Sequence, residues 1–185
     1  LSSEEAERLI DSASVSLKHM ILVALNTGMR KSEILGLTWR DIDFSISTIS
    51  IRDSKNGDGR KIPMNETVLA TLSDLGRKEN DEKVFLRPGG QPVKSIRTAF
   101  ENAVKRAGID DFRFHDLRHT FASWLVMSGV DIKTVQELLG HKTFSMTLRY
   151  SHLSAQHKAE AVRCLDGKSG KILDRSDEED RRRIS

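Results

Sequence analysis

The stretch from Asp41 to Met64, DIDFSISTISIRDSKNGDGRKIPM, decides the fold class, because its pattern of side chains differs from the rest of the chain. In its first half, apolar residues recur among Ser, Thr and Asp, which favours strands through Ile42, Phe44, Ile46, Ile49 and Ile51. Residues 56–59, Asn-Gly-Asp-Gly, are a strong turn signal, and Arg60 to Met64 predicts a return strand that ends at Pro63. The stretch therefore predicts a small three-stranded antiparallel sheet, with Lys55 close to its turn.

Helical patterns lie on both sides of this sheet. Before it, Ser2 or Ser3 followed by two glutamates predicts a helix start. The apolar stretch from Leu17 to Asn26 predicts a buried helix that Gly28 can end, and a short helix is expected over residues 32–37. After the sheet, capping residues and helical apolar spacing predict helices that begin near Asn65, Val93, His115, Asp131, Ser145 and Ala155. We therefore expect an α+β fold that is mostly helical.

Length and composition limit the class of protein. With 185 residues, of which 37% are hydrophobic, the chain suits one domain with a real core. We expect that domain to span residues 1–165 and the charge-dense segment 166–185 to be a disordered tail. Cys164 is the only cysteine, so a reducing compartment is expected. No apolar run approaches the roughly 20 residues that span a bilayer, and no secretory signal opens the chain, so we expect a soluble cytoplasmic protein without a membrane partner.

The positive charge of the chain is modest but unevenly distributed. The formal net charge is +3, which does not by itself identify a nucleic-acid-binding protein. Segment 87–106 is locally basic, with one acidic residue, Glu101, against Arg87, Lys94, Arg97, Lys105 and Arg106. Such a surplus suits contact with backbone phosphates, although a solvated helix face explains it equally well.

Six residues spread along the chain have side chains suited to breaking a phosphodiester bond. In chain order they are Arg30, Lys55, His115, Arg118, His141 and Tyr150, and the last is the only tyrosine. A guanidinium group matches two phosphate oxygens, an imidazole can donate or accept a proton, and a phenolic hydroxyl is a plausible nucleophile. Their spacing of three places His115 and Arg118 on one face of a predicted helix.

Each of these residues alone has an ordinary structural explanation. Arg30 can form an ion pair with Glu33 at a helix start. His141 follows a helix-ending glycine, and Tyr150 alone is more often a packing residue. Lys55 is the weakest candidate, because a lysine near a hairpin turn is usually solvated, and Lys61 is a rival on the neighbouring strand. The combined set, in this order, is what indicates a function.

The order and local context of these residues strongly resemble the tyrosine recombinase (phage integrase) family. The matching stretches are TGMRKSEILGL at 27–37, SKNGDGRKIPM at 54–64, FHDLRHTFA at 114–122, LLGH at 138–141 and RYSH at 149–152. The resemblance covers roughly residues 1–165, fills all six catalytic positions and implies the catalytic-domain fold of that family. Family members usually also carry an N-terminal helical domain that helps to clamp DNA, so we expect a fragment with impaired DNA affinity.

The resemblance implies a mechanism of strand breakage and rejoining. Tyr150 would attack the scissile phosphate and form a 3′-phosphotyrosyl link, while Arg30 and Arg118 would hold the non-bridging oxygens. His141 would be a further donor. Because the covalent link conserves the phosphodiester energy, the reaction would need no ATP, cofactor or metal.

Further roles and partners follow from the same resemblance. Lys55 would protonate the leaving 5′-oxygen, and His115 would assist the tyrosine proton. The expected partners are double-stranded DNA, a homotetramer of the protein in the recombination synapse and accessory DNA-bending proteins. Segment 155–165 is expected to dock on a neighbouring subunit. The expected location is the cytoplasm of a bacterial or phage-infected cell, on nucleoid DNA.

Three other interpretations remain open. A type IB topoisomerase-like enzyme uses the same tyrosine link to relax DNA, and the compact size and the LLGH and RYSH contexts favour a recombinase over it. A metallohydrolase would use His115 and His119, four apart as in a zinc motif, but Arg118 would then place a positive charge on the same turn. A fragment that binds DNA without turnover is the third.

Overall fold

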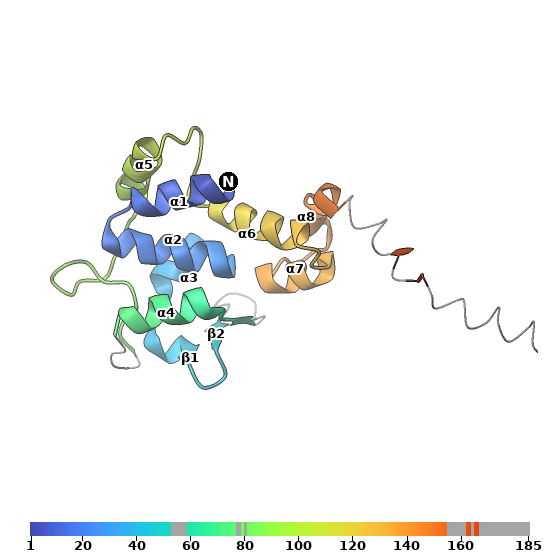
Figure 1. Ribbon diagram of the computed structural model, residues 1–185. Helices are drawn as coiled ribbons and strands as arrows, with labels where there is room; N and C mark the ends of the chain where they lie inside the picture. Colours follow the sequence, from blue (N-terminus) through green and yellow to red (C-terminus); the bar gives the residue numbers. More distant parts are fainter. Residues whose placement is uncertain (53–58, 77–78, 80, 155–161, 164, 167–185) are drawn as a thin grey trace, which may run out of the picture.

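The computed structural model (Figure 1) describes residues 1–52, 59–76, 79, 81–154, 162–163 and 165–166. Its helices are α1 (Ser3–Asp11), α2 (Val15–Thr27), α3 (Lys31–Gly36), α4 (Glu66–Asp74), α5 (Arg97–Arg106), α6 (Asp116–Met127), α7 (Ile132–Leu139) and α8 (Ser145–Leu148). Two short 3-10 turns are η1 (Trp39–Asp41) and η2 (Ser151–Ser154), and the strands are β1 (Ile42–Asp43), β2 (Thr48–Ile51) and β3 (Arg60–Pro63). The expectations for Lys55 and for the helix near Ala155 fall on residues outside this description, as does almost all of the expected tail.

The predicted sheet is confirmed as three antiparallel strands in the order β1-β2-β3. Its register pairs Ile42 with Ile49 and Ile49 with Ile62, so these three side chains form one face, and all three are buried. The expectation of a strand position at Ile46 is wrong. The chain reverses there, with Ser47 at φ 49°, and Ile46 is 60% exposed.

Local signals predicted most helix ends correctly. Ser2 caps α1 in a capping box with Glu5, and the side chains of Asn65 and Asp131 cap α4 and α7. α5 begins at Arg97, later than predicted from Val93, with Ile96 as its N-cap; the preceding residues 86–92 form a turn closed by a bridge between Leu86 and Pro92. Among the described helices, none is both long and apolar enough to cross a lipid bilayer.

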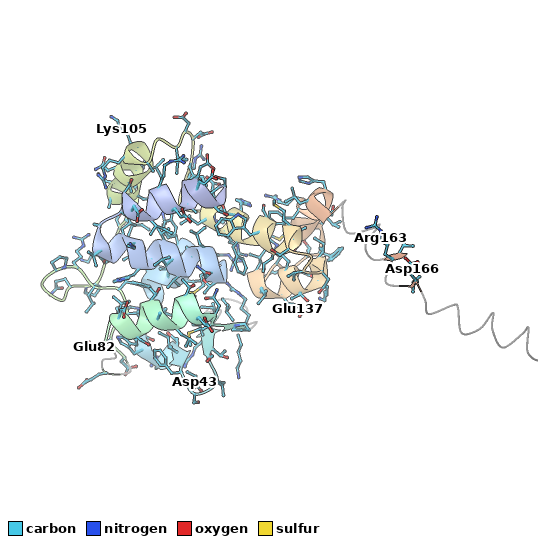
Figure 2. The ribbon with its side chains drawn as sticks, in the orientation of Figure 1. Asp43, Glu82, Lys105, Glu137, Arg163 and Asp166 are labelled. Atoms are coloured by element: carbon cyan, nitrogen blue, oxygen red, sulfur yellow. The ribbon has the colours of Figure 1, made fainter. Side chains whose placement is uncertain are left out.

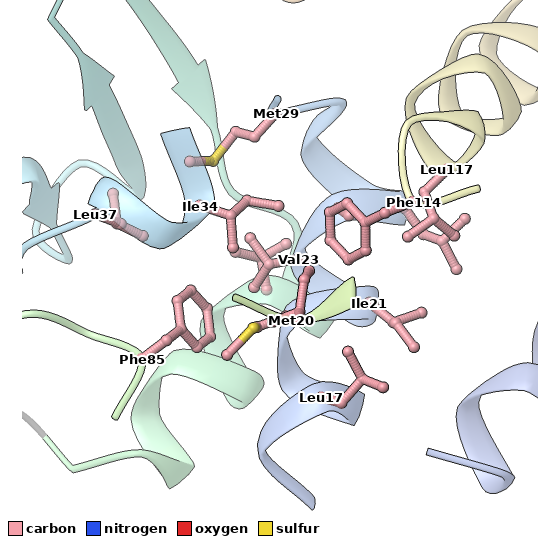
Figure 3. Packing of buried hydrophobic residues seen from close by; sticks show 14 of the residues in the cluster. Leu17, Met20, Ile21, Val23, Met29, Ile34, Leu37, Phe85, Phe114 and Leu117 are labelled. Atoms are coloured by element: carbon pink, nitrogen blue, oxygen red, sulfur yellow. The ribbon is translucent and has the colours of Figure 1, made fainter. Parts of the chain in front are cut away.

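Helix α2 lies at the centre of the main hydrophobic core. Its side chains Leu17, Met20, Ile21 and Val23 are at most 3% exposed and pack among side chains from α3, α6 and the loop that holds Phe85 (Figure 3). The core is therefore built around one almost wholly apolar helix, as the stretch 17–26 predicted.

A second, smaller cluster joins α6 and α7 to the turn after α8. It consists of Phe121, Ala122, Val126, Val135, Leu139 and Tyr150. Figure 1 shows α6 extending from the α1 and α2 layers towards α7 and α8. Gly28, at the end of α2, lies against this cluster, since a Cβ atom there would come within 2.4 Å of the ring of Phe121. The end of α2 and the end of α7 are thereby brought together.

Candidate active site

The C-terminal end of α7 is the centre of the candidate site. Backbone carbonyls at a helix end lack partners within the helix, and the helix dipole favours positive charge there. Three successive carbonyls each accept a hydrogen bond from a different arginine: Leu138 from Arg60 Nε at 2.9 Å, Leu139 from Arg118 Nη2 at 2.5 Å, and Gly140 from Arg30 Nη2 at 3.4 Å. The fold thereby gathers three guanidinium groups at one helix end despite their mutual repulsion.

Arg118 is the most deeply buried of the three arginines, at 3% exposed. Its Nη1 donates to the carbonyl of Gly28 at 2.6 Å, so the same guanidinium group ties the end of α2 to the end of α7. Burial lowers the pKa of Arg118 to about 10, and the nearby charges of Arg30 and Arg60 act in the same direction. The group still carries its positive charge at neutral pH.

Glu33 holds the other two arginines in place. Its carboxylate accepts from Arg30 Nη1 at 2.8 Å and from both terminal nitrogens of Arg60, at 2.9 and 2.8 Å. Burial raises the pKa of Glu33, but the hydrogen bonds and charge of Arg60, with hydrogen bonds from Arg30, outweigh it and lower that pKa to about 2. Glu33 is therefore a carboxylate at all ordinary pH values and offsets part of the local positive charge.

Gly140 allows Arg60 to approach the end of α7. It has φ +63°, a conformation that L side chains rarely adopt, and a Cβ atom there would lie 2.8 Å from Arg60 Cδ. A glycine is needed at this position for two independent reasons, the backbone conformation and the space that Arg60 occupies.

His141 follows Gly140 and is also within the site. Its Nδ1 lies 2.9 Å from the hydroxyl oxygen of Thr147, a fully buried residue of α8. Burial, reinforced by the charges of Arg118 and Arg30, lowers the pKa of His141 to about 4. The imidazole is therefore neutral at pH 7, with one nitrogen able to donate and one able to accept a hydrogen bond.

Tyr150 is buried, at 5% exposed, and belongs to the same cluster as Leu139, whose carbonyl Arg118 binds. Its hydroxyl oxygen lies 2.5 Å from Nδ1 of His119. Burial raises the pKa of Tyr150 above its ordinary value, and the charges of Arg149 and Arg118 offset only part of that rise. The phenol is therefore held at a defined position close to a buried positive charge.

Comparison with known proteins assigns this arrangement to a family. Residues 1–157 match the Phage integrase family. The chain belongs to this family. It is 38% identical over 180 residues to the integrase of Salmonella phage P22, a match that covers 90% of this chain and 46% of that protein. The chain spans between 46% and 61% of the length of the curated relatives it matches.

Solved structures of integrases agree with this assignment. The catalytic domain of bacteriophage HP1 integrase is 30% identical with a TM-score of 0.71, and the match covers 88% of this chain and 92% of that one. The Tn1549 transposon integrase, solved in complex with circular intermediate DNA, is 31% identical with a TM-score of 0.62, covering 73% of this chain and 53% of that one. The chain thus has the fold of an integrase catalytic domain, mostly helical with a small antiparallel sheet.

In this member of the phage integrase family, the structure brings together five of the six site residues predicted from the sequence. Four lie in the network at the end of α7 or beside it, namely Arg30, Arg118, His141 and Tyr150. His115 is at the start of α6, with its ring edge-to-face against His119 and the ring centroids 5.1 Å apart. Lys55 lies outside the described residues. Its rival Lys61 is an exposed residue of β3, opposite Ser50.

Three residues of the site were missed by sequence reasoning. Glu33 was considered only as a local partner of Arg30, and Arg60 only as part of a strand. His119 was considered only as a metal ligand, whereas the structure places it, and not His115, against the tyrosine hydroxyl. These contacts join residues 27 to 78 positions apart, so no local pattern signals them.

The basic segment 87–106 lies apart from the site. Figure 2 shows Lys105, on α5, on the opposite side of the molecule from Glu137, on α7. Two of its arginines have partners within the protein. Arg97 is paired with Glu101 at 2.9 Å, and Arg106 donates to the carbonyl of Ser12. Contact of this segment with phosphates stays a prediction.

A groove of about 740 Å³ opens beside Arg30 and runs from the end of α7 towards the sheet. Basic side chains outnumber acidic ones along it, with Glu33 and Asp41 against Arg30, Arg40, Arg52, Arg60, Lys83 and Lys142. A concave surface of this charge suits a polyanion whose phosphates continue past the site.

Proposed function

We propose that this chain is the catalytic part of a tyrosine-type site-specific DNA recombinase of the integrase type, which cleaves and rejoins DNA strands. One observation carries the proposal: the only tyrosine of the chain is buried in the cluster that contains Leu139, whose carbonyl binds Arg118. A nucleophile and a phosphate-binding cation are therefore adjacent before any DNA is present.

The proposed roles of the arginines follow from their fixed positions. Arg30 and Arg118 bind the two non-bridging oxygens of the scissile phosphate and oppose the negative charge that develops as it is attacked. His141, neutral and beside them, donates a further hydrogen bond from the nitrogen that does not face Thr147. Donors of this kind typically contribute about 10²–10³ in rate each.

The high pKa of a tyrosine hydroxyl explains why positive charge is needed around the proposed nucleophile. With an ordinary pKa near 10, only about 0.1% of a tyrosine is ionised at pH 7, a deficit of roughly 4 kcal/mol. In the proposed step a bond forms between the Tyr150 oxygen and phosphorus, and the bond from phosphorus to the 5′-oxygen breaks. The tyrosine loses a proton and the 5′-oxygen gains one, for which Lys55 is the candidate donor. Another 5′-hydroxyl can reverse the step, so neither ATP nor metal is required.

Double-stranded DNA is the proposed substrate. The basic groove beside Arg30 supports this, as does the likeness to the Tn1549 integrase, which was solved with DNA bound. Exchange between two duplexes needs four cleavage events, so we propose that four protomers assemble on the DNA, with accessory DNA-bending proteins as further partners. The relationship to a phage integrase supports a location in the cytoplasm of a bacterial or phage-infected cell.

The test is capture of the covalent intermediate in the presence of EDTA. The substrate is a pool of nicked duplexes, randomised around the nick, whose short 5′ fragment diffuses away after cleavage and traps the adduct. We expect a protein–DNA adduct on denaturing gels with the wild-type chain and none with Tyr150→Phe. An adduct that survives this substitution would refute the assignment of the nucleophile. Sequencing the trapped DNA then identifies the site, and exchange between two such duplexes distinguishes a recombinase from a relaxing enzyme.

A further inference from the structure

The hydroxyl of Tyr150 is held by a residue of α6 that follows directly after Arg118. The hydroxyl oxygen and His119 Nδ1 are 2.5 Å apart, and the two rings are tilted at 46° with their centroids 6.0 Å apart. Tyr150 lies just beyond α8, 31 positions later in the chain, so the contact forms only when α6 and the turn after α8 are packed together. It positions the oxygen that would become bonded to phosphorus.

We propose that His119 accepts the proton of Tyr150 as the tyrosine attacks the phosphate, the role first predicted for His115. This inference rests on the proposed function. His119 would thus be a catalytic residue additional to the six found from the sequence, because it touches the reacting oxygen itself.

The position of the two histidines on α6 distinguishes them. They lie one turn apart, and their rings meet edge-to-face at an interplanar angle of 85°. Among the described contacts, the hydrogen-bond partner of the Tyr150 hydroxyl is His119 Nδ1. His115 contacts the ring of His119 and helps to restrict its orientation, so we infer that its influence on Tyr150 is indirect.

Burial, together with the charges around His119, lowers the pKa of its ring and favours the neutral form, which can accept a proton. The titratable and charged groups that face it are His115, Asp116 and Arg118 on α6, and Arg149 and Tyr150 from the segment after α8. Burial lowers the pKa of His119, the charges of His115, Arg149 and Arg118 add to this, and Asp116 acts in the opposite direction. In the proposed arrangement the neutral phenol donates its O–H and Nδ1 accepts, which requires the hydrogen of the imidazole to be on Nε2.

The proposed step balances its protons and bonds. As the bond from the Tyr150 oxygen to phosphorus forms, the hydroxyl proton moves to His119 Nδ1 and the ring becomes an imidazolium. The bond to the 5′-oxygen breaks, and that oxygen takes a proton from a separate acid, for which Lys55 is the candidate. In the reverse direction the imidazolium returns its proton to the tyrosine oxygen, so one residue serves cleavage and rejoining alike.

The first measurement needs no DNA. In protein with ¹⁵N-labelled histidine, the nitrogen chemical shifts report the tautomer of each ring, assigned by substituting the histidines one at a time. We expect His119 to carry its hydrogen on Nε2 and its Nδ1 signal to move in Tyr150→Phe, which removes only the hydroxyl. A His119 ring with its hydrogen on Nδ1, or an Nδ1 signal that Tyr150→Phe leaves unmoved, would overturn the inference.

The second measurement is the rate of adduct formation on the nicked duplexes, followed from about pH 5 to about pH 9. His119→Asn keeps an acceptor near the position of Nδ1 but cannot take a proton, and His119→Leu removes both properties. We expect both variants to slow adduct formation by about 10²–10⁴ and to lose the fall in rate that protonation of His119 causes at low pH. His152→Asn, the same substitution at an exposed histidine of η2, is the matched control and should behave as wild type.

The outcomes separate the two proposals. If the wild-type chain forms the adduct and His119→Asn matches it in rate and pH dependence, His119 does not accept the proton, and the proposed function stands. If only His119→Leu is slow, the residue merely positions the tyrosine, and the inference fails. If the wild-type chain forms no adduct with any duplex, the proposed function fails and the catalytic role of His119 fails with it, whatever the nitrogen shifts show.

Discussion

The carboxylate of Glu33 accepts a hydrogen bond from each terminal nitrogen of Arg60, at 2.9 and 2.8 Å, although the two residues are 27 positions apart in the chain. The same carboxylate binds the guanidinium group of Arg30 and its backbone N–H. Arg60 thus fixes Glu33, and Glu33 fixes Arg30, so an arginine of β3 orients the arginine at the start of α3 that we propose binds phosphate. Arg60 is a positioning residue, which makes a specific prediction about its replacement.

Arg60→Lys should slow adduct formation although the positive charge is kept. Lysine cannot make the paired hydrogen bonds to Glu33 together with the bond to Leu138, so we expect a loss of about 2 kcal/mol in unfolding free energy. Urea denaturation and single-turnover adduct formation measure the two effects. Arg97→Lys, in an exposed ion pair on α5, is the control and should change neither quantity. Equal rates for Arg60→Lys and wild type would refute the positioning role.

Acid should destabilise the protein in part through Glu33. The pKa of this carboxyl is lowered from 4.5 to about 2 in the folded protein, so its stabilising effect is complete above pH 4.5 and is lost as pH falls towards 2. After allowance for solvent screening, the loss amounts to about 2 kcal/mol. Denaturation by urea at a series of pH values should show this loss in wild type and a shallower slope in Glu33→Gln. An unchanged slope in that variant would contradict the pKa shift.

Gly140→Ala should lower stability and the rate of adduct formation more than Gly108→Ala does. Gly108 has φ +64° and no atom within 4 Å of a Cβ placed there, whereas at Gly140 the Cβ meets Arg60 Cδ at 2.8 Å. Gly108→Ala therefore carries the backbone strain alone, about 1 kcal/mol, and should leave the adduct rate unchanged. Gly140→Ala should cost more stability and slow adduct formation, because Arg60 must move. Thermal unfolding of the two variants side by side measures the difference, and equal losses would argue against the contact.

Thr147→Val should affect catalysis through His141. Valine keeps the shape of threonine but removes the hydroxyl that contacts His141 Nδ1, which leaves the imidazole orientation unfixed. We expect about 1–2 kcal/mol less stability and a slower adduct rate with DNA affinity unchanged. The control is Thr71→Val on α4, a buried threonine whose hydroxyl bonds only its own helix. It should lose similar stability without any change in rate, and a rate loss there as well would indicate a general effect of unfolding.

Local features of the fold could be predicted from the sequence because their causes are local. The cap at Asp131, the buried apolar helix α2 and the pairing of strands β2 and β3 each depend on residues close to one another in the sequence. Ile46 was placed wrongly for a related reason. The alternation of apolar residues continues through it, but the chain must reverse between β1 and β2, and that reversal leaves the side chain in solvent.

The contacts within the site could not be predicted in the same way. The types and order of the candidate residues indicated the chemistry, yet which histidine meets Tyr150 depends on how α6 packs against the segment after α8. The role of Arg60 depends on β3 lying next to the end of α7, with 78 residues between the arginine and Leu138. Only tertiary packing brings such groups together, and a local sequence pattern does not show which distant segments will pack against each other.

The guanidinium group of Arg118 joins the ends of α2 and α7 through Gly28 and Leu139. Its rotational freedom is therefore lost when the chain folds, and a phosphate that arrives later meets a side chain whose torsion angles are already set. The loss of entropy on ordering this side chain occurs during folding and does not recur when phosphate binds. In the proposed reaction, the site would therefore present its positive charge at the same position to each scissile phosphate in turn.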